Sequence, residues 1–339
     1  MILAAGVGSR LDPLTQGLPK PLCPVLGKPV MEHIVDLCKK HGFVNLAANT
    51  HVLADKIKEH FMDSDKKFGV NLNLVHEPEL TGIAGGIRSA KKYLTADVVL
   101  VIMGDALTDV NLTRLYEAHI KGNCPVTIGI KEVEDTRQYG VVVTDRNSRV
   151  VSFQEKPKPH EAKSNLANTA IYFFNQNILN EIPPQEEAPF YDVATDLFSK
   201  LMSKNIPMQA VNIDAYWADI GTLKQYQESI KDAFDGKVKI EFKKGIKGKV
   251  YFADGVKIGK NVVIKDYVYI EKNCEIQDGS YIDNSIIWSG SKIGKNVKII
   301  NSILGNNCRV NDGTEMISNS VWAPDTLIQN GSKPAVVLT

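Results

Sequence analysis

The sequence has little of what stabilises disulfide-linked or zinc-bound proteins. Its 339 residues include five cysteines, which are scattered, and no Cys-x-x-Cys pair is present. This argues against a disulfide framework or a zinc site and favours a reducing compartment. The cysteines are Cys23, Cys38, Cys124, Cys274 and Cys308.

A strong charge of one sign and long apolar runs are also lacking. The formal net charge is +1, which gives no electrostatic reason to expect nucleic acid or a membrane surface as a partner. No apolar run approaches the ~20 residues of a membrane helix. The first residues show no basic segment of the kind that opens a secretory signal. We therefore expect a cytoplasmic protein of about two domains, at ~100–200 residues each.

Two common nucleotide-binding motifs are missing. A P-loop closes with Gly-Lys-Ser/Thr, and no such segment occurs. The dinucleotide motif needs a third glycine that opens a helix, but Leu11 stands at that position, three residues after Gly8. Any nucleotide site in this chain must therefore be built from another pattern.

Such a pattern is present in residues 3–22, LAAGVGSRLDPLTQGLPKPL. A short apolar strand leads into the loop Gly6-Val7-Gly8, where successive exposed N–H groups can form a concavity for anions. Arg10 adds a planar fork of donors, and Lys20, held between two prolines, adds a point charge. Together these residues predict a site for a polyphosphate.

From residue 1 to about residue 230, strands and helices alternate. Residues 98–103 form a continuous apolar run, as is typical of a central parallel strand buried on both faces, and the run ends at Gly104-Asp105. The alternation predicts a Rossmann-like, doubly wound α/β sheet with ligands at the carboxyl ends of its strands. We expect further strands at 45–49, 72–76, 125–130, 139–144, 150–155, 168–174 and 208–213, and helices at 29–41, 54–61, 85–94, 194–204 and 223–235.

Past residue 245 the sequence becomes a hexapeptide repeat. Aliphatic residues recur every six positions, and the frame slips by one residue twice before the repeat ends. This predicts a parallel β-helix with the aliphatic residues inside and Gly, Asn or Asp at the corners. The repeated positions are Ile258, Ile264, Ile270, Ile276, Ile282, Ile293, Ile299, Leu304, Val310 and Met316. We expect domains at 1–235 and 246–332, joined by a linker at 236–245.

The opening run resembles the signature of the sugar-1-phosphate nucleotidylyltransferases, with Ser9 in place of threonine. Segments at 80–85, 139–142, 153–157, 168–172 and 216–222 resemble further elements of that family, and the repeat resembles its left-handed β-helix. The resemblance implies that a nucleotidyl group passes from a nucleoside triphosphate to a sugar-1-phosphate, with release of pyrophosphate. It also implies a homo-oligomer formed through the β-helix.

Asp105 is placed to hold Mg²⁺ against a polyphosphate because it follows a buried strand. Asp109 and Asn111 are better placed to cap the next helix. By spacing alone, Asp219 is either a turn residue before Gly221 or a second metal ligand, and the resemblance implies the metal role.

The resemblance implies the remaining site residues. The catalytic residues would be Arg10, Lys20, Asp105, Lys156 and Asp219. The nucleotide would be bound by Leu3, Ala4, Ala5, Gly6, Gly8, Ser9, Arg10, Glu77, Gly82, Ala84 and Gly85. The sugar phosphate would be bound by Gly140, Glu155, Lys156 and Asn168, and the metal by Asp105 and Asp219.

Three positions besides Ser9 depart from the family pattern. Thr81 interrupts the base loop, and Ile83 stands where the family usually has threonine. Ala170 replaces a glycine, and we expect its methyl group to narrow the sugar pocket. Without the resemblance, Lys156 would be taken as a solvated surface lysine.

Several functions remain open. The pattern most resembles mannose-1-phosphate guanylyltransferases, which join GTP and mannose-1-phosphate. Glucose-1-phosphate thymidylyl-, uridylyl- or adenylyltransfer is the alternative. A non-catalytic regulator that binds nucleotide-sugars is disfavoured because the five predicted catalytic residues are intact. An acyltransferase with a histidine base in the coils is disfavoured because the last histidine is His160.

Overall fold

The computed structural model describes residues 1–241 and 246–338. The chain folds into two compact units. The sheet unit contains Met1–Gly6, Ile34–Gly104 and Asp109–Trp217, and the coil unit contains Val7–His33, Asp105–Thr108 and Ala218–Thr339. The domain limits expected from the sequence stay a prediction, and part of the expected linker, residues 242–245, lies outside the described residues.

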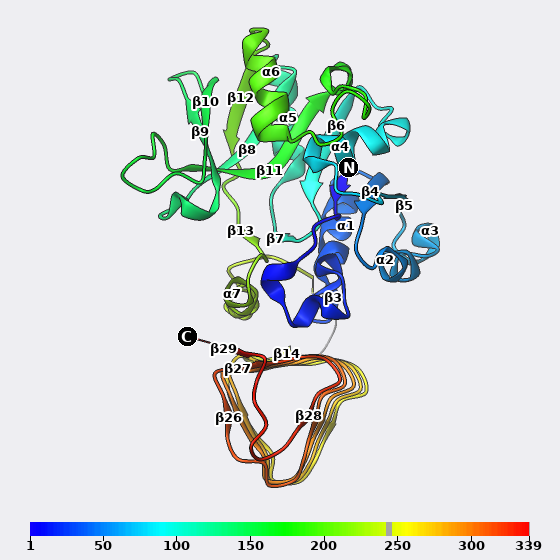
Figure 1. Ribbon diagram of the computed structural model, residues 1–339, viewed down its shortest axis with the longest axis vertical. Coiled ribbons are helices and arrows are strands. Elements are labelled where there is room, and N and C mark those ends of the chain that lie inside the picture. The colour runs from blue at the N-terminus through cyan, green and yellow to red at the C-terminus, as the bar shows by residue number, and fades with distance from the viewer. Residues whose placement is uncertain (242–245, 339) are drawn as a thin grey trace. The chain divides into compact units, whose positions relative to one another are not determined.

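The sheet unit is built on one sheet, in the order β10-β9-β11-β6-β1-β4-β5, with β8 paired to β11 and β12 paired to β8 (Figure 1). Strands β1, β4, β5 and β6 are parallel, and β11 is antiparallel to β6. The parallel half confirms the predicted α/β class. The strands are β1 (Ile2–Leu3), β4 (Asn45–Thr50), β5 (Asn71–His76), β6 (Val98–Met103), β8 (Val126–Glu132), β9 (Gly140–Thr144), β10 (Val150–Glu155), β11 (Leu166–Asn175) and β12 (Met208–Asn212).

Strand β6 is the apolar run expected at the centre of the sheet. It lies between β1 and β11, and Val101 and Ile102 are buried. Helix α4 packs against β4, and α5 packs against β8, β11 and β12. The helices of the chain are α1 (Val30–Lys40), α2 (Ala54–His60), α3 (Ser64–Lys67), α4 (Gly82–Ala90), α5 (Leu112–Gly122), α6 (Phe198–Ser203) and α7 (Leu223–Phe234).

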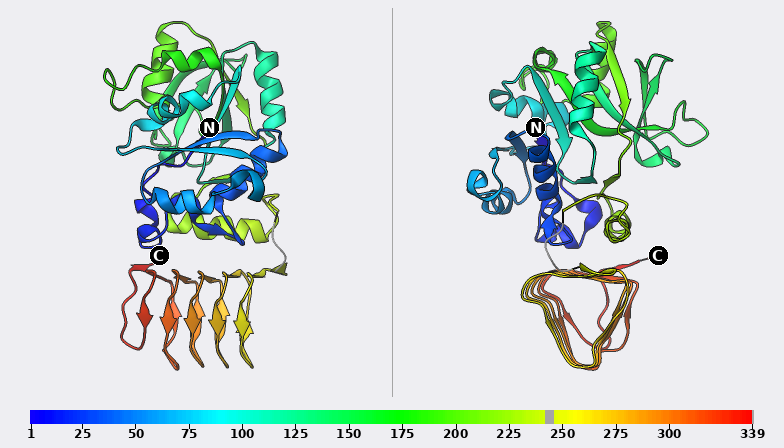
Figure 2. Two further views of the ribbon diagram at one scale, coloured as in Figure 1. Left: turned by 90° about the vertical axis from the view of Figure 1, so that its right-hand side faces the viewer. Right: turned by 180° about the vertical axis from the view of Figure 1, so that it is seen from behind.

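The coil unit contains the predicted β-helix, whose coils stack along one axis (Figure 2). Three parallel sheets form its sides. One has β15 (Val250–Phe252), β18 (Val268–Ile270), β21 (Ile286–Ile287), β24 (Ile303–Leu304) and β27 (Ser320–Trp322), with β14 (Ile246–Lys247) and β29 (Val336–Val337) at its ends. The second has β16 (Lys257–Ile258), β19 (Glu275–Ile276), β22 (Lys292–Ile293), β25 (Arg309–Val310) and β28 (Leu327–Ile328). The third has β17 (Val263–Ile264), β20 (Tyr281–Asp283), β23 (Lys298–Ile300) and β26 (Ile317–Ser318).

The aliphatic repeat stacks inside the coil as predicted, with one error of register. Ile276 pairs with Ile293, and both are buried. Met316, however, is 56% exposed, and Ile317 takes the inward position opposite Ile299. The step from Val310 to Ile317 is seven positions instead of six, so the frame slips a third time between them. Asparagines hold the expected corners with positive φ, at Asn261, Asn273, Asn284, Asn296, Asn301, Asn307 and Asn319.

Two short strands complete the coil unit near the opening run. They are β2 (Pro24–Val25) and β3 (Lys28–Pro29), which pair antiparallel as a hairpin. Two more, β7 (Ala106–Thr108) and β13 (Trp217–Asp219), pair with each other. None of the helices in the described part of the chain has the length and apolar character that a membrane span requires.

Candidate active site

The loop after β1 passes from the buried sheet to the surface. Leu3, Ala4 and Ala5 are buried, whereas Gly6 and Arg10 are exposed. Gly8 has φ +76°, and a Cβ there would lie 3.0 Å from the Cβ of Lys20, so the structure requires glycine. A Cβ at Gly6 would meet nothing within 4 Å. The loop, including Ser9 in the short turn after Gly8, is therefore open to a ligand.

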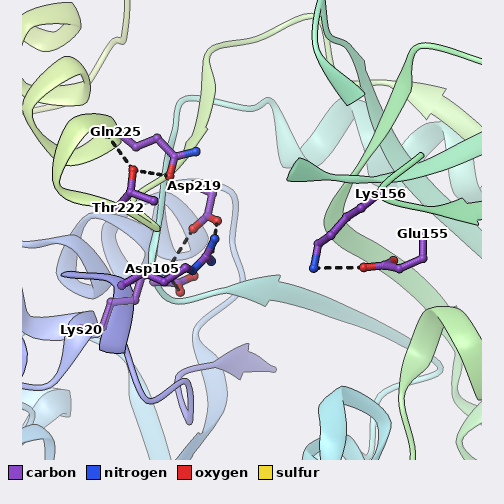
Figure 3. A network of polar contacts seen from close by, with 8 residues as sticks. Lys20, Asp105, Glu155, Lys156, Asp219, Thr222 and Gln225 are labelled. Atoms are coloured by element: carbon purple, nitrogen blue, oxygen red, sulfur yellow. Dashed lines mark hydrogen bonds and ion pairs between the residues drawn. The ribbon is translucent and has the colours of Figure 1, made fainter. Parts of the chain in front are cut away.

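Three charged residues from separate segments converge in the coil unit (Figure 3). Lys20 Nζ lies 2.5 Å from Asp105 Oδ2 and 3.1 Å from Asp219 Oδ1. Lys20 occupies the buried turn between Pro19 and Pro21, Asp105 precedes β7, and Asp219 ends β13. Because β7 pairs with β13, the two carboxylates are brought to the same place.

Arg10 lies at the edge of this cluster. Its guanidinium is 3.9 Å from Asp219 and 63% exposed, so the pair contributes little to stability. Gly221 has no room for a side chain, because its Cβ would lie 2.8 Å from Asp219 Oδ2 and 3.1 Å from Arg10 Nη2. Arg10 is therefore placed near Asp219, with a largely exposed side chain that a ligand could reach.

The cluster shifts the titration of its members. Burial by itself would lower the pKa of Lys20, but the nearby Asp105 and Asp219 outweigh it and raise the pKa. Burial raises the pKa of Asp105, and Asp219 adds to this while Lys20 opposes it. Lys20 is consequently a permanent buried cation at neutral pH.

The same cluster fits a divalent cation of the Mg²⁺ type. Asp105 Oδ1 is buried with no hydrogen-bond partner in the described part of the chain. Asn111, not Asp105, caps α5 by accepting a hydrogen bond from the Arg114 amide at 3.0 Å. Mg²⁺ in proteins is often held by one or two carboxylates together with substrate phosphates and water. Asp105 and Asp219 are such a donor pair.

In the sheet unit, a buried polar network follows the ends of β1, β4 and β5. The Asn49 amide oxygen accepts a hydrogen bond from the Ala4 N–H at 2.9 Å, and its Nδ2 donates to Glu77 at 2.7 Å. The other oxygen of Glu77 accepts from the Thr81 hydroxyl at 2.7 Å and from the Thr81 amide at 3.3 Å. Glu77 is only 3% exposed. The network therefore ties the loop after β1 to the segment before α4.

The small residues of the predicted base loop are required by packing. Gly82 has φ +82°, and its Cβ would lie 2.5 Å from the Tyr191 carbonyl oxygen. A Cβ at Gly85 would lie 2.5 Å from Thr81 Oγ1, and Ala84 is fully buried. Thr81, which interrupts the family pattern, is thus the partner that holds Glu77.

A cavity of about 230 Å³ brings together three of the predicted sugar-site residues. Gly140, Glu155 and Asn168 line it, together with Val141, Phe153, Gln154, Ala194, Thr195 and Ser199. Phe153 stacks on Phe198 with ring centroids 5.0 Å apart, which supports an apolar side of the cavity. Polar groups beside an apolar surface are a common lining for a small-molecule site.

Lys156 is not among the residues that line this cavity. It has φ +43°, and its ammonium pairs with Glu155 at 3.2 Å while 58% exposed (Figure 3). Ala170 is not among the residues that line this cavity, and the expectation that it narrows the sugar pocket stays a prediction. Ala170 instead occupies a β-bulge in β11 at φ +54°, where its N–H donates to Asn168 Oδ1 at 3.0 Å.

Four site residues were missed by sequence reasoning. Asn49 and Thr81 belong to the Glu77 network, and Thr195 and Ser199 line the cavity. Asn49 comes near the carboxyl end of a predicted strand, a position that could have drawn attention to it. Thr195 and Ser199 carry no comparable signal, because they reach the cavity only through the packing of α6 and the turn before it.

Comparisons with known proteins agree with this architecture. Residues 1–235 match the family described as nucleotidyl transferase, and residues 246–333 match the GMPPB C-terminal domain. The chain is 34% identical to the UTP–glucose-1-phosphate uridylyltransferase of Synechocystis sp., over 99% of its own length and 94% of that protein. It is 29% identical to the mannose-1-phosphate guanyltransferase beta-B of Xenopus laevis, over 97% of its own length and 92% of that protein.

Among solved structures, a putative glucose-1-phosphate thymidylyltransferase of Bacillus anthracis superposes with a TM-score of 0.61 at 24% identity. The match covers 72% of this chain and 96% of that chain. This likeness concerns the fold alone.

Proposed function

The chain belongs to the nucleotidyl transferase family, and on this premise we propose that it joins a nucleoside triphosphate to a sugar-1-phosphate and releases pyrophosphate. The observation that carries the proposal is the buried Lys20 between Asp105 and Asp219, where one Asp105 oxygen has no hydrogen-bond partner among the residues that the structure describes. A fixed cation beside a pair of metal-type carboxylates suits the charge that builds up during phosphoryl chemistry.

The reaction would be a single in-line displacement. An oxygen of the sugar phosphate attacks the α-phosphorus, the bond to the β-phosphate bridging oxygen breaks, and pyrophosphate leaves with that electron pair. A phosphate monoester has a second pKa of ~6, so the nucleophile is mostly ionised at neutral pH and needs no general base. Catalysis then consists of positioning and charge neutralisation.

Each residue has a proposed task in this scheme. The loop of Gly6, Gly8 and Ser9, with Arg10, binds the triphosphate and the departing pyrophosphate. Lys20 neutralises charge at the reacting phosphate, and Lys156 binds the phosphate of the sugar. A Mg²⁺ bound by Asp105 and Asp219 would supply further neutralisation of the phosphate oxygens. The Glu77 network holds the loops that surround the nucleotide in place.

For the sugar pocket, we propose that the 230 Å³ cavity takes the sugar ring. Glu155 and Asn168 would bind its hydroxyl groups, and the backbone of Gly140 would lie beside it. The apolar face formed by Phe153 suits the C–H face of a sugar ring. Thr195 and Ser199 would add two hydroxyl groups to the wall.

The finer proposal is GTP and mannose-1-phosphate as substrates. It is supported by the match of residues 246–333 to the GMPPB C-terminal domain and by the Xenopus laevis relative. Glucose-1-phosphate with UTP is the second candidate, supported by the 34% identity to the Synechocystis sp. enzyme. We further propose a cytoplasmic location, which the buried and unpaired cysteines support.

The test is pyrophosphate release with Mg²⁺ for GTP, dTTP, UTP, ATP and CTP, each with mannose-1-phosphate and glucose-1-phosphate. We expect one dominant pair, GTP with mannose-1-phosphate. A maximum at UTP and glucose-1-phosphate would keep the reaction and replace the substrates. Absence of release from every pair, with nucleotide-sugar binding retained, would favour the regulator in place of the enzyme.

A further inference from the structure

The hairpin that follows Lys20 has a strained tip. Leu26 and Gly27, between β2 and β3, have φ +45° and +89°. Leu26 is fully buried, and a bulky residue in the left-handed region costs ~1–2 kcal/mol. Such strain persists only where the surroundings enforce it. The residues in contact with this tip must therefore hold it in this conformation.

Tyr269, in the first coils of the β-helix, binds the hairpin tip, and Tyr251 lies beside it. The Gly27 N–H donates a hydrogen bond to the Tyr269 hydroxyl at 3.0 Å. A side chain at Gly27 would collide with the Tyr251 hydroxyl. Tyr251 and Tyr269 pack edge to face, with ring centroids 5.5 Å apart. The hairpin tip is thus seated on the β-helix, and only a glycine fits.

A buried carboxylate orients the Tyr269 hydroxyl. That hydroxyl has one proton, which it donates to Glu271 Oε1, so its lone pair faces the Gly27 N–H. Glu271 is 4% exposed, and its other oxygen accepts from the Ser289 hydroxyl at 3.2 Å and the Lys272 amide at 3.3 Å. Glu271 therefore fixes the direction in which Tyr269 receives the hairpin.

A second hydroxyl makes the same kind of bridge. Tyr226, on α7, donates to the Pro24 carbonyl at 2.6 Å and accepts from Trp288 Nε1 at 2.9 Å. Tyr226 and Trp288 are both fully buried. Pro24 begins β2, so the base of the hairpin is held as well as its tip.

The hairpin is continuous with the turn that carries Lys20. The Cys23 amide donates to the Lys20 carbonyl at 3.0 Å, and the Val30 amide closes the hairpin on the Cys23 carbonyl at 3.0 Å. These two hydrogen bonds link the Lys20 turn to the hairpin that ends in Gly27. The ammonium of Lys20 must stay within hydrogen-bond reach of two carboxylates.

We propose that Tyr269 and Glu271 are positioning residues for Lys20, so that the β-helix takes part in catalysis as well as in assembly. The inference rests on the proposed function, because it assigns Lys20 a task in nucleotidyl transfer. Glu271 sets Tyr269, Tyr269 sets the hairpin through Gly27, and the hairpin sets the turn of Lys20. Small errors of position at a reacting group are costly to rate.

A double-mutant cycle tests this. Tyr269→Phe removes both the acceptor of the Gly27 N–H and the donor to Glu271. We expect kcat to fall about tenfold while KM for both substrates stays within about twofold. In a Lys20→Met background the same substitution should change kcat by less than about twofold, because residues acting through one group are non-additive. Glu271→Gln, which keeps an acceptor for Tyr269, should retain most of the rate, whereas Glu271→Leu should match Tyr269→Phe.

Tyr251→Phe is the matched control, since its hydroxyl makes no hydrogen bond within the described residues. It should keep the wild-type kcat. Rates are measured at a temperature well below the unfolding midpoint of each variant. If Tyr269→Phe does not fold, Glu271→Leu takes its place in the cycle.

Three outcomes are informative. A tenfold loss that disappears in the Lys20→Met background supports the proposal. An unchanged kcat in Tyr269→Phe, or an equal loss in both backgrounds, overturns it and leaves the proposed function intact. A Lys20→Met variant with wild-type rate would overturn the proposed role of Lys20, and the positioning proposal with it.

Discussion

At the residue scale, the side chain of Lys156 is exposed, and its ammonium pairs with Glu155. A charge-assisted hydrogen bond to phosphate is worth ~1.5–3 kcal/mol, so we expect Lys156→Met to raise KM for the sugar-1-phosphate about 10- to 100-fold. KM for the nucleotide should change less than about twofold. Lys158→Met, at an exposed lysine in the same loop, is the control. Steady-state kinetics check this, and equal effects of the two substitutions would remove Lys156 from the phosphate site.

Ala170 is a residue whose backbone does not suit its side chain. An alanine at φ +54° carries the ~1–2 kcal/mol cost of the left-handed region, against ~0.5–1 kcal/mol of extra chain entropy for glycine. Ala170→Gly should therefore leave the free energy of unfolding unchanged or raise it by up to about 1 kcal/mol. Ala167→Gly, in the regular part of β11, should lower it. Denaturant unfolding measures both free energies. A clear decrease in the free energy of unfolding of Ala170→Gly would show that the strain argument is wrong.

At the element scale, Thr222 links the candidate site to a helix. Its hydroxyl accepts a hydrogen bond from the Gln225 amide at 3.2 Å and caps α7, three residues after Asp219. Loss of a threonine cap costs ~1 kcal/mol, so Thr222→Ala should lower the unfolding midpoint and reduce kcat modestly. Thr222→Ser keeps the oxygen and should behave as the wild type. Identical midpoints for the two variants would mean that the cap contributes nothing.

Most elements were predictable because their signals are local. The run at 98–103 became β6, and the hexad positions became the stacked strands of the β-helix. The bulge at Ala170 was not predictable, since it lies where β11 changes partner from β9 to β6 on one edge while β8 stays paired on the other. The slip before Ile317 was also missed, because the apolar Met316 stands at the expected six-residue spacing and was taken for the inward residue.

The candidate site was predicted unevenly. Asp105 and Lys20 were identified, and the structure brings them within 2.5 Å. The contacts that support the Lys20 turn were not identified, because contacts such as that of Gly27 with Tyr269 join residues far apart in the chain. Glu77 was named from the family pattern alone, and its buried bonds to Asn49 and Thr81 could only come from the fold.

At the scale of the whole molecule, the β-helix remains a proposed site of self-association. Its first and last coils expose apolar side chains, including Ile258 at 42% and Leu327 at 54%. Apolar surface of this kind is common where subunits meet. We expect sedimentation velocity to show a dimer or larger species at micromolar concentration. A single monomer species over a wide concentration range would contradict this assembly role.

The proposed reaction depends most directly on the carboxylate of Asp105, which would hold the divalent cation beside the phosphates. Asp105→Asn keeps the shape of the side chain and removes the charge, and we expect circular dichroism and the unfolding midpoint to show a folded protein. Asp214→Asn, at an exposed aspartate, controls for the loss of one negative charge.

The measurement is therefore kcat for pyrophosphate release by Asp105→Asn beside the wild type and Asp214→Asn, with Mg²⁺ and the best substrate pair. Loss of a group that stabilises transition-state charge typically costs ~10²–10³-fold, and we predict a fall of at least about 10²-fold for Asp105→Asn alone. A folded Asp105→Asn variant with kcat within about twofold of the wild type would contradict the account.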